Sequence, residues 1–181
     1  MRTRKNTNQE WPLRIPATPL GPLCLYFTSA GLAALEFGEG GPENPAHQDP
    51  PPPALGPLME QTAKKLTAYF AGVATDFSSL PLDLKGTPFQ VRVWRELRRI
   101  PRGETISYRE LARRVGSLRA FRAVGRANAA NPVPLIIPCH RVINADGSLG
   151  GYSSGVDRKR WLLAHEGAFQ AVRLRRPQAA L

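Results

Sequence analysis

The segment Leu135–Ile143, read as LIIPCHRVI, places one of the chain's two cysteines directly before a histidine and an arginine. A thiolate is a strong nucleophile, and a histidine within reach of the thiol can act as its base. Arg141 adds positive charge, which we expect to favour the thiolate over the ordinary thiol pKa of about 8.5. Free cysteine is also among the most buried residue types, so an inert core thiol beside a satisfied core histidine remains the competing interpretation.

A carboxylate downstream is a candidate third member of this group. The run from Asp157 to His165 predicts a helix, and Gly167 suits the position just after its end. Glu166 then lies at the helix C-terminus, where the helix dipole disfavours negative charge. Such a placement calls for a partner such as His140, although a solvated surface glutamate is the default interpretation.

The residues before the cysteine predict a helix-turn-helix. Thr87 and Pro88 begin a first helix, and Ser107 with Glu110 has the spacing of a capping box for a second. After a Gly-Ser turn, we expect a third helix from Arg119 to Ala130, and then a buried extended piece at Leu135–Ile137. In the third helix three arginines share one face and small residues occupy the other, an arrangement that suits a DNA groove: Arg119, Arg122 and Arg126.

Charge is concentrated in the same half of the chain. Residues 88–181 carry eighteen Lys and Arg against six Asp and Glu, whereas residues 1–87 carry seven against eight. This one-sided basicity favours a polyanionic partner, nucleic acid before membrane. A solvated basic face with a basic tail is the alternative.

The first half predicts a small sheet and a helix. Two β-type runs, Leu23–Phe27 and Leu32–Phe37, flank a turn, and an amphipathic helix is expected from Leu58 to Ala71. The predicted fold is therefore α/β with two domains, a small N-terminal β-sheet plus helix domain and a mostly helical C-terminal domain with a winged helix-turn-helix. The expected boundaries are 1–19 without regular structure, 20–85 with a proline-rich connection at 41–57, 86–167, and a basic tail at 168–181.

Several motifs in the second domain together closely resemble the O6-alkylguanine-DNA alkyltransferases, or methylated-DNA–protein-cysteine methyltransferases. The resemblance covers about Gly86 to Gly167 and is weak in the first domain. The motifs are Ser107-Tyr108, Arg122-Ala123-Val124-Gly125, Asn131-Pro132-Val133-Pro134, Ile137-Pro138-Cys139-His140-Arg141-Val142, Gly151-Tyr152-Ser153 and Trp161-Leu162-Leu163-Ala164-His165-Glu166-Gly167.

The resemblance implies a DNA repair protein that extrudes O6-alkylguanine from double-stranded DNA and transfers the alkyl group irreversibly to Cys139. It implies His140 as the base acting through a water, Glu166 as its orienting carboxylate, and Tyr108 as a donor to the leaving guanine. Asn131 would tie the helix to the active-site turn, and Arg122 would enter the base stack. Tyr152 and Ser153 would contact the extruded base, and Gln90, Arg109 and Ser117 would contact phosphates.

Other properties are expected as follows. We expect no cofactor and no zinc, because Cys24 and His47 are the only first-domain candidates for the zinc site that some relatives carry. A cytoplasmic monomer is expected, nucleoid-associated or nuclear according to the organism, with cooperative assembly on DNA left open. Two alternatives remain: a Cys-His hydrolase, and a lesion-binding or regulatory winged-helix module that performs no transfer.

Overall fold

The computed structural model describes residues 10–38 and 50–168 of the 181-residue chain. The chain divides into two compact units, Met1–Lys85 and Gly86–Leu181. Within the described residues, no helix is long and apolar enough to cross a membrane. His47, most of the proline-rich connection and all but the first residue of the expected basic tail lie outside this description.

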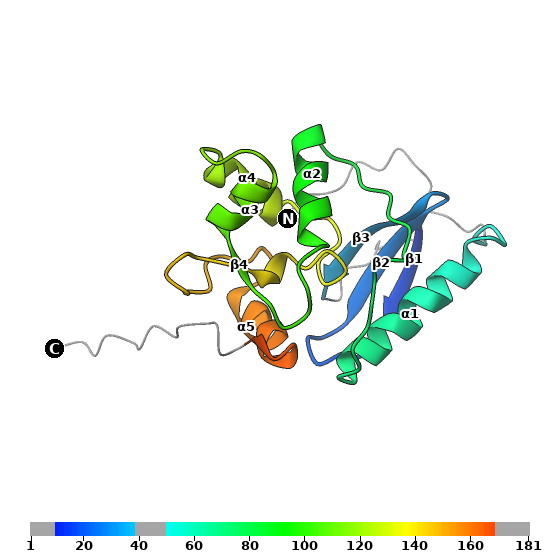
Figure 1. The fold of residues 1–181 in the computed structure, drawn as a ribbon. Helices are drawn as coiled ribbons and strands as arrows, with labels where there is room; N and C mark the ends of the chain where they lie inside the picture. The colour runs from blue at the N-terminus through cyan, green and yellow to red at the C-terminus, as the bar shows by residue number, and fades with distance from the viewer. Residues whose placement is uncertain (1–9, 39–49, 169–181) are drawn as a thin grey trace. The chain divides into compact units, whose positions relative to one another are not determined.

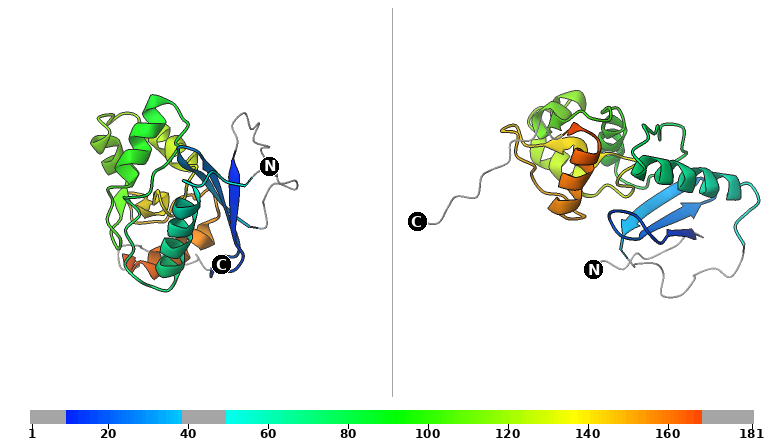
Figure 2. Two further views of the ribbon diagram at one scale, coloured as in Figure 1. Left: turned by 90° about the vertical axis from the view of Figure 1, so that its right-hand side faces the viewer. Right: turned by 90° about the horizontal axis from the view of Figure 1, so that it is seen from below.

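The first unit is an antiparallel sheet with one helix along a face (Figures 1 and 2). Its strands follow the order β1-β2-β3, and Leu25 in the buried central strand lies opposite Leu13 and Leu35. Gly31 forms the hairpin turn at φ +145°, where an added Cβ would lie 2.5 Å from the Pro81 carbonyl oxygen. The elements are β1 (Trp11–Ile15), β2 (Leu23–Thr28), β3 (Gly31–Phe37) and α1 (Gly56–Phe70).

The expectation that residues 1–19 carry no regular structure is wrong for β1. Trp11, Leu13 and Ile15 alternate with Pro12 and Arg14, and this period of two lets the strand cover one face of the sheet while it pairs with β2. Trp11 is buried. A five-residue edge strand at the end of the basic N-terminal stretch gave too weak a pattern to be recognised from the sequence.

The second unit is mostly helical. Thr87 caps α2 as expected, and Gln90 completes a capping box by accepting from the Thr87 backbone N–H at 2.8 Å. Trp94 on α2 is buried and donates to the Ala127 carbonyl at 2.8 Å, which ties α2 to α4. The elements are α2 (Pro88–Leu97), β4 (Ile106–Ser107), α3 (Tyr108–Arg114), α4 (Phe121–Ala129), the 3-10 helix η1 (Cys139–Arg141), β5 (Val142–Ile143) and α5 (Val156–His165).

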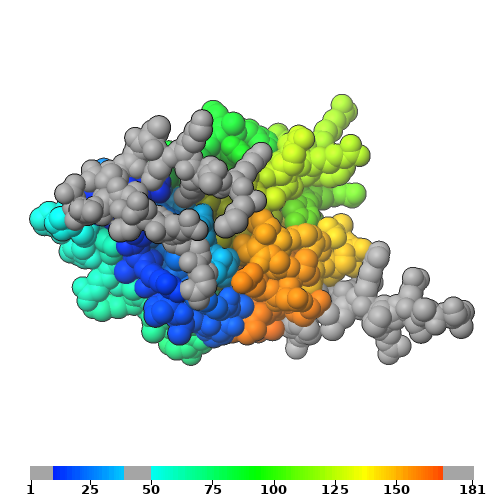
Figure 3. Space-filling model, turned by 180° about the vertical axis from the view of Figure 1, so that it is seen from behind, coloured from blue at the N-terminus to red at the C-terminus, as the bar shows by residue number. Residues whose placement is uncertain are grey.

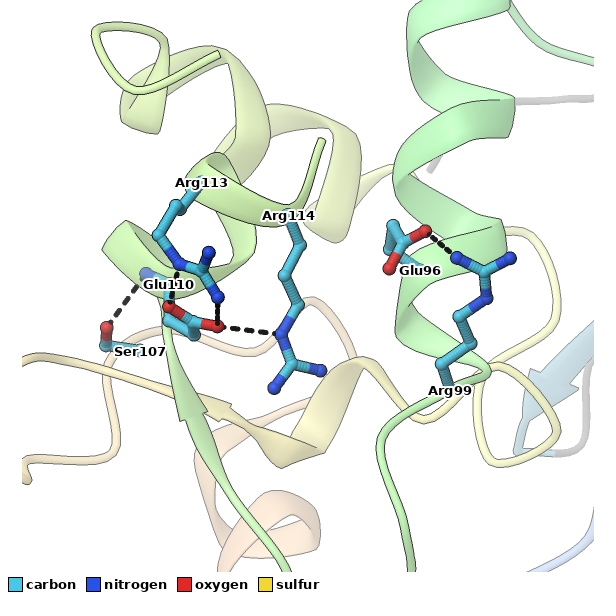
Figure 4. A network of polar contacts seen from close by, with 6 residues as sticks. All are labelled: Glu96, Arg99, Ser107, Glu110, Arg113 and Arg114. Atoms are coloured by element: carbon cyan, nitrogen blue, oxygen red, sulfur yellow. Dashed lines mark hydrogen bonds and ion pairs between the residues drawn. The ribbon is translucent and has the colours of Figure 1, made fainter. Parts of the chain in front are cut away.

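The helix pair α3–α4 differs in two details from the expected helix-turn-helix. Ser107 caps α3, but Glu110 binds Arg113 and Arg114 at 2.8–2.9 Å, which leaves the capping box one-sided (Figure 4). Helix α4 begins at Phe121, so Arg119 lies before the helix and does not share its arginine face. Helix α3 ends before this point. The backbone N–H groups of Gly116 and Ser117 bond to the carbonyls of Arg113 and Ala112, and these bonds close the turn after α3.

The expected extended piece at Leu135–Ile137 is a buried turn. Asn131 accepts from the Val133 N–H at 3.0 Å and donates to the Ile137 carbonyl at 2.8 Å, so one side chain closes the loop. Leu135 adopts φ 73° inside this loop. The apolar run is therefore buried by a side-chain-bonded loop and not by strand pairing, a distinction that hydrophobicity alone does not make.

Candidate active site

Cys139 begins η1, and its side chain is buried. Burial raises the pKa of the thiol, although hydrogen bonding with Asn131 and Tyr152 and the positive charge of Lys159 act in the opposite direction. The resting form is therefore the thiol. The expectation that positive charge from Arg141 favours the thiolate in the resting protein is wrong, because burial outweighs the effects that lower the thiol pKa and the Arg141 guanidinium is bonded elsewhere.

His140 and Glu166 form a fully buried pair. His140 Nε2 lies 3.0 Å from Glu166 Oε1. Burial raises the pKa of Glu166, but hydrogen bonds and positive charge from Arg141 and His140 outweigh it and hold that pKa well below its ordinary value. An ionised carboxylate only accepts hydrogen bonds, so Nε2 carries the proton and Nδ1 is the basic nitrogen.

The remaining nitrogen of His140 is available for proton transfer. Nδ1 is buried and has no hydrogen-bond partner among the described residues. Burial lowers the pKa of His140, and the positive charges of Arg141 and Lys159 lower it further. Glu166 raises this pKa only in part, so the ring is neutral near pH 7. A neutral imidazole next in sequence to a buried thiol, fixed in one tautomer by a carboxylate, has the character of a general base.

Arg141 holds the carboxylate in place. Its guanidinium donates twice to Glu166, from Nε at 2.8 Å and from Nη2 at 2.9 Å, and a third time to the Ile100 carbonyl at 2.5 Å. Glu166 caps the C-terminus of α5 and Gly167 follows at φ 79°. The unfavourable helix-dipole position is thus compensated by a bidentate ion pair that joins α5 to η1, and Arg141 also bonds to the Ile100 backbone after the end of α2.

Lys159 is a buried cation that the sequence did not single out. Its ammonium donates to three backbone carbonyls, those of Val142 at 2.6 Å, Leu149 at 2.5 Å and Gly151 at 3.4 Å. Burial lowers its pKa to about 8, and the negative charge of a Cys139 thiolate opposes this effect. Lys159 therefore ties the loop around Gly151 to the strand that follows the active-site turn.

A small pocket brings three predicted residues together. It has a volume of about 190 Å³ and is lined by Tyr108, Gly125, Asn128, Ala129, Gly151, Tyr152 and Ser153. Burial raises the pKa of Tyr108, a Cys139 thiolate raises it further, and hydrogen bonding with Asn128 opposes both, so the hydroxyl keeps its proton. Asn128 was missed by the sequence analysis; it is buried and donates weakly to the Cys139 carbonyl at 3.4 Å.

The residues predicted to contact DNA are placed differently from one another. Arg122 lies in the first turn of α4, and Arg109 lies at the start of α3, where it lines a hollow beside the pocket. Ser117 lines a separate hollow in the turn between α3 and α4, with Arg113 and Arg119. Gln90 is committed to capping α2 through its side-chain oxygen and lines none of these hollows.

Metal ligands do not gather in the part of the chain that the structure describes. No group of three or more His, Cys, Asp or Glu side chains there has the arrangement of a metal site. Cys24 is buried on β2, and its expected companion His47 lies outside the described residues.

Comparison with known proteins gives a consistent result over both units. Residues 88–168 match the family described as 6-O-methylguanine DNA methyltransferase, DNA binding domain, and residues 14–84 match its ribonuclease-like domain. The methylated-DNA–protein-cysteine methyltransferase of Mycobacterium bovis is 47% identical over 150 residues, 82% of this chain and 88% of that protein. Its namesake from Methanosarcina barkeri is 44% identical over 151 residues, 82% and 92% of the two chains. The crystal structure of Mycobacterium tuberculosis OGT in complex with DNA is 42% identical, covers 89% of this chain and 94% of that one, and has a TM-score of 0.73.

Proposed function

The chain belongs to the 6-O-methylguanine DNA methyltransferase family, and from this premise we propose that it repairs O6-alkylguanine by moving the alkyl group onto Cys139. Its activity class is that of a methylated-DNA–protein-cysteine methyltransferase. The observation that carries the residue assignment is the buried chain of contacts from Arg141 through Glu166 to His140, beside a buried thiol.

The chemistry proceeds as a displacement at saturated carbon. His140 Nδ1 takes the thiol proton, directly or through one water, and Glu166 stabilises the imidazolium that forms. The Cys139 sulfur then bonds to the alkyl carbon as the bond from that carbon to O6 breaks. The electron pair of the broken bond remains on the guanine, and Tyr108, whose hydroxyl keeps its proton, donates a hydrogen bond to the developing charge.

The pocket beside the cysteine is the proposed place for the extruded base. Enzymes that react with a base inside a duplex rotate that base out of the stack into a close-fitting pocket. Tyr152 can stack on the guanine and Ser153 can bond near O6, while Asn131 holds the turn that presents Cys139. Arg122, at the start of α4, is proposed to fill the gap left in the stack, and Arg109 and Ser117 to contact phosphates.

The proposed partner is double-stranded DNA that contains O6-alkylguanine, bound by a monomer. Because its substrate is part of chromosomal DNA, the protein is proposed to act in the nucleoid of a prokaryote or in the nucleus of a eukaryote. The product is a thioether, which water does not cleave under these conditions, and Cys24, the chain's other cysteine, does not line the pocket. Each molecule should therefore act once.

Intact mass spectrometry tests this function directly. The protein is incubated with a duplex that carries one O6-methylguanine, alongside a Cys139→Ala variant and a Cys24→Ser control. Transfer adds one methylene, about 14 Da, to the wild type and to the Cys24 control but not to the Cys139 variant. An unchanged mass in a folded wild-type protein that binds the duplex would overturn transfer and leave the lesion-binding module, whereas continuous release of product would indicate a hydrolase.

A further inference from the structure

Phe121, at the start of α4, has a large apolar side chain that is exposed to solvent. It is 51% exposed, and it directly precedes Arg122. The Arg122 guanidinium lies over the Phe121 ring, 5.9 Å from the ring centre. The space-filling view shows yellow-green side chains of the segment around α4 standing out from the surface (Figure 3). An exposed aromatic ring offers a contact surface to a partner. The same ring attracts the guanidinium that lies over its face.

The ring also borders a hollow next to the base pocket. This hollow has a volume of about 370 Å³ and is lined by Tyr108, Arg109, Phe121, Gly125, Asn144 and Ala145. Two of these residues, Tyr108 and Gly125, also line the pocket proposed for the extruded guanine. If a base enters that pocket, its strand passes over the shared wall, which brings the neighbouring nucleotide to the hollow.

We propose that Phe121 is a second DNA-contacting residue beside Arg122, packing its ring against the sugar and base edge of the nucleotide next to the extruded guanine. The proposal rests on the proposed function. Apolar side chains inserted at base steps are a recurrent way to hold an opened duplex, and an aromatic face takes any base. The ring also restricts the Arg122 guanidinium to orientations along its face.

Charge argues for a nucleic acid strand and against an apolar peptide as the occupant. Two arginines border the ring, Arg109 across the hollow and Arg122 over its face, and no acidic side chain lines the hollow. A ligand there must combine an apolar sugar or base with negative charge. A deoxynucleotide in a strand does so.

The proposal is tested by measuring single-turnover alkylation of the protein by two substrates. A duplex with one O6-methylguanine requires base extrusion, whereas free O6-benzylguanine base enters the pocket without it. Phe121→Ala should lower the rate on the duplex about tenfold, the usual range for loss of one base-aromatic contact, and change the rate on the free base less than twofold. Phe121→Tyr should keep the duplex rate, since it retains the ring.

Val73→Ala is the matched control. Val73 is an apolar side chain of similar exposure, 56%, but it lies in the first unit and lines none of the hollows named above, so its loss should change neither rate. An unchanged duplex rate in Phe121→Ala overturns the proposal, and so does an equal fall on both substrates, which would indicate a role in the site's structure. Failure of the proposed function is distinguishable, because Cys139 of the wild type would then be alkylated by neither substrate.

Discussion

Replacing Lys159 with methionine should impair alkyl transfer far more than it impairs folding. Methionine fills a similar volume but removes the three hydrogen bonds that the ammonium makes to the carbonyls of Val142, Leu149 and Gly151. Two of these bonds lead to the loop that supplies Tyr152. The loop would keep its chain connection but lose the contact that fixes its distance from the active-site turn.

The effect on stability follows from two opposing contributions. The buried Val142 carbonyl costs about 1–3 kcal/mol without its donor, and the carbonyls of half-buried Leu149 and exposed Gly151 cost less because water can reach them. Against this, the variant no longer buries an ammonium, and a pKa lowered from 10.5 to about 8 corresponds to about 3 kcal/mol. The net change in the free energy of unfolding is therefore within about 2 kcal/mol of zero, which shifts Tm by less than about 8 °C for a chain of this size.

The effect on rate is not offset in this way. A displaced Tyr152 loses its contact with the thiol and its place against the base, and misplacement by about 1 Å costs on the order of 100-fold in rate. Both duplex and free-base substrates should be affected, since both use the pocket. Arg160→Met is the matched control, because Arg160 lies on the same helix, is half exposed and, among residues 10–38 and 50–168, has its one side-chain ion pair with Asp157 at 2.7 Å.

A time course of alkylation, quenched at intervals and followed by intact-mass spectrometry, measures the rate. Thermal unfolding of the same samples measures stability. A Lys159→Met protein that alkylates at the wild-type rate would refute the proposed role of the loop contact. A variant that loses rate only in proportion to its unfolded fraction would refute it as well, because the lysine would then serve the fold alone.

The remaining predictions concern the groups around the thiol. Glu166→Gln should lower the transfer rate at least tenfold and destabilise the protein by about 3–5 kcal/mol, because it leaves the buried Arg141 without its charge partner; rate and urea unfolding measure the two effects. Tyr108→Phe should lower the rate about 10–100-fold on duplex and free base while DNA affinity in a gel-shift assay stays the same; a weakened affinity with unchanged rate would contradict it. The pKa of His140 is depressed in the folded protein, so the unfolded chain binds that proton first and stability should fall as pH drops below about 6.5. His140→Asn should flatten this part of the stability curve, and an unaltered curve would count against a neutral buried imidazole.

Local patterns predicted most of the helices correctly. Thr87 and Ser107 cap α2 and α3 as their spacing indicated, and Gly167 follows the end of α5, because each signal acts within a few residues of the backbone that it satisfies. The hairpin of β2 and β3 was predicted for the same reason. Contacts with distant backbone were missed: Lys159 binds a carbonyl 17 residues away, and Arg141, noted from the sequence only for its charge, binds one 41 residues away.

The proposed site shows why sequence adjacency misled the electrostatic prediction. Cys139, His140 and Arg141 are neighbours in the chain, but η1 directs the guanidinium to Glu166 and Ile100. Arg141 therefore fixes the carboxylate that fixes the histidine. The roles assigned to Gln90 and Ser117 stay predictions, and for Gln90 the capping box already explains why that residue type stands there.

A buried thiol with a raised pKa suits a protein that uses its nucleophile once. A permanent thiolate would react with any soft electrophile, and each such reaction would consume a whole protein molecule. Here burial keeps Cys139 protonated, and in the proposed mechanism the neutral His140 receives the proton only when the thiolate gains a partner. In that mechanism the Glu166 carboxylate, held in place by Arg141, stabilises the imidazolium without changing the resting state of the sulfur. The arrangement stabilises the charge-separated form selectively, so reactivity depends on an alkylated base in the pocket and not on solvent exposure of the cysteine.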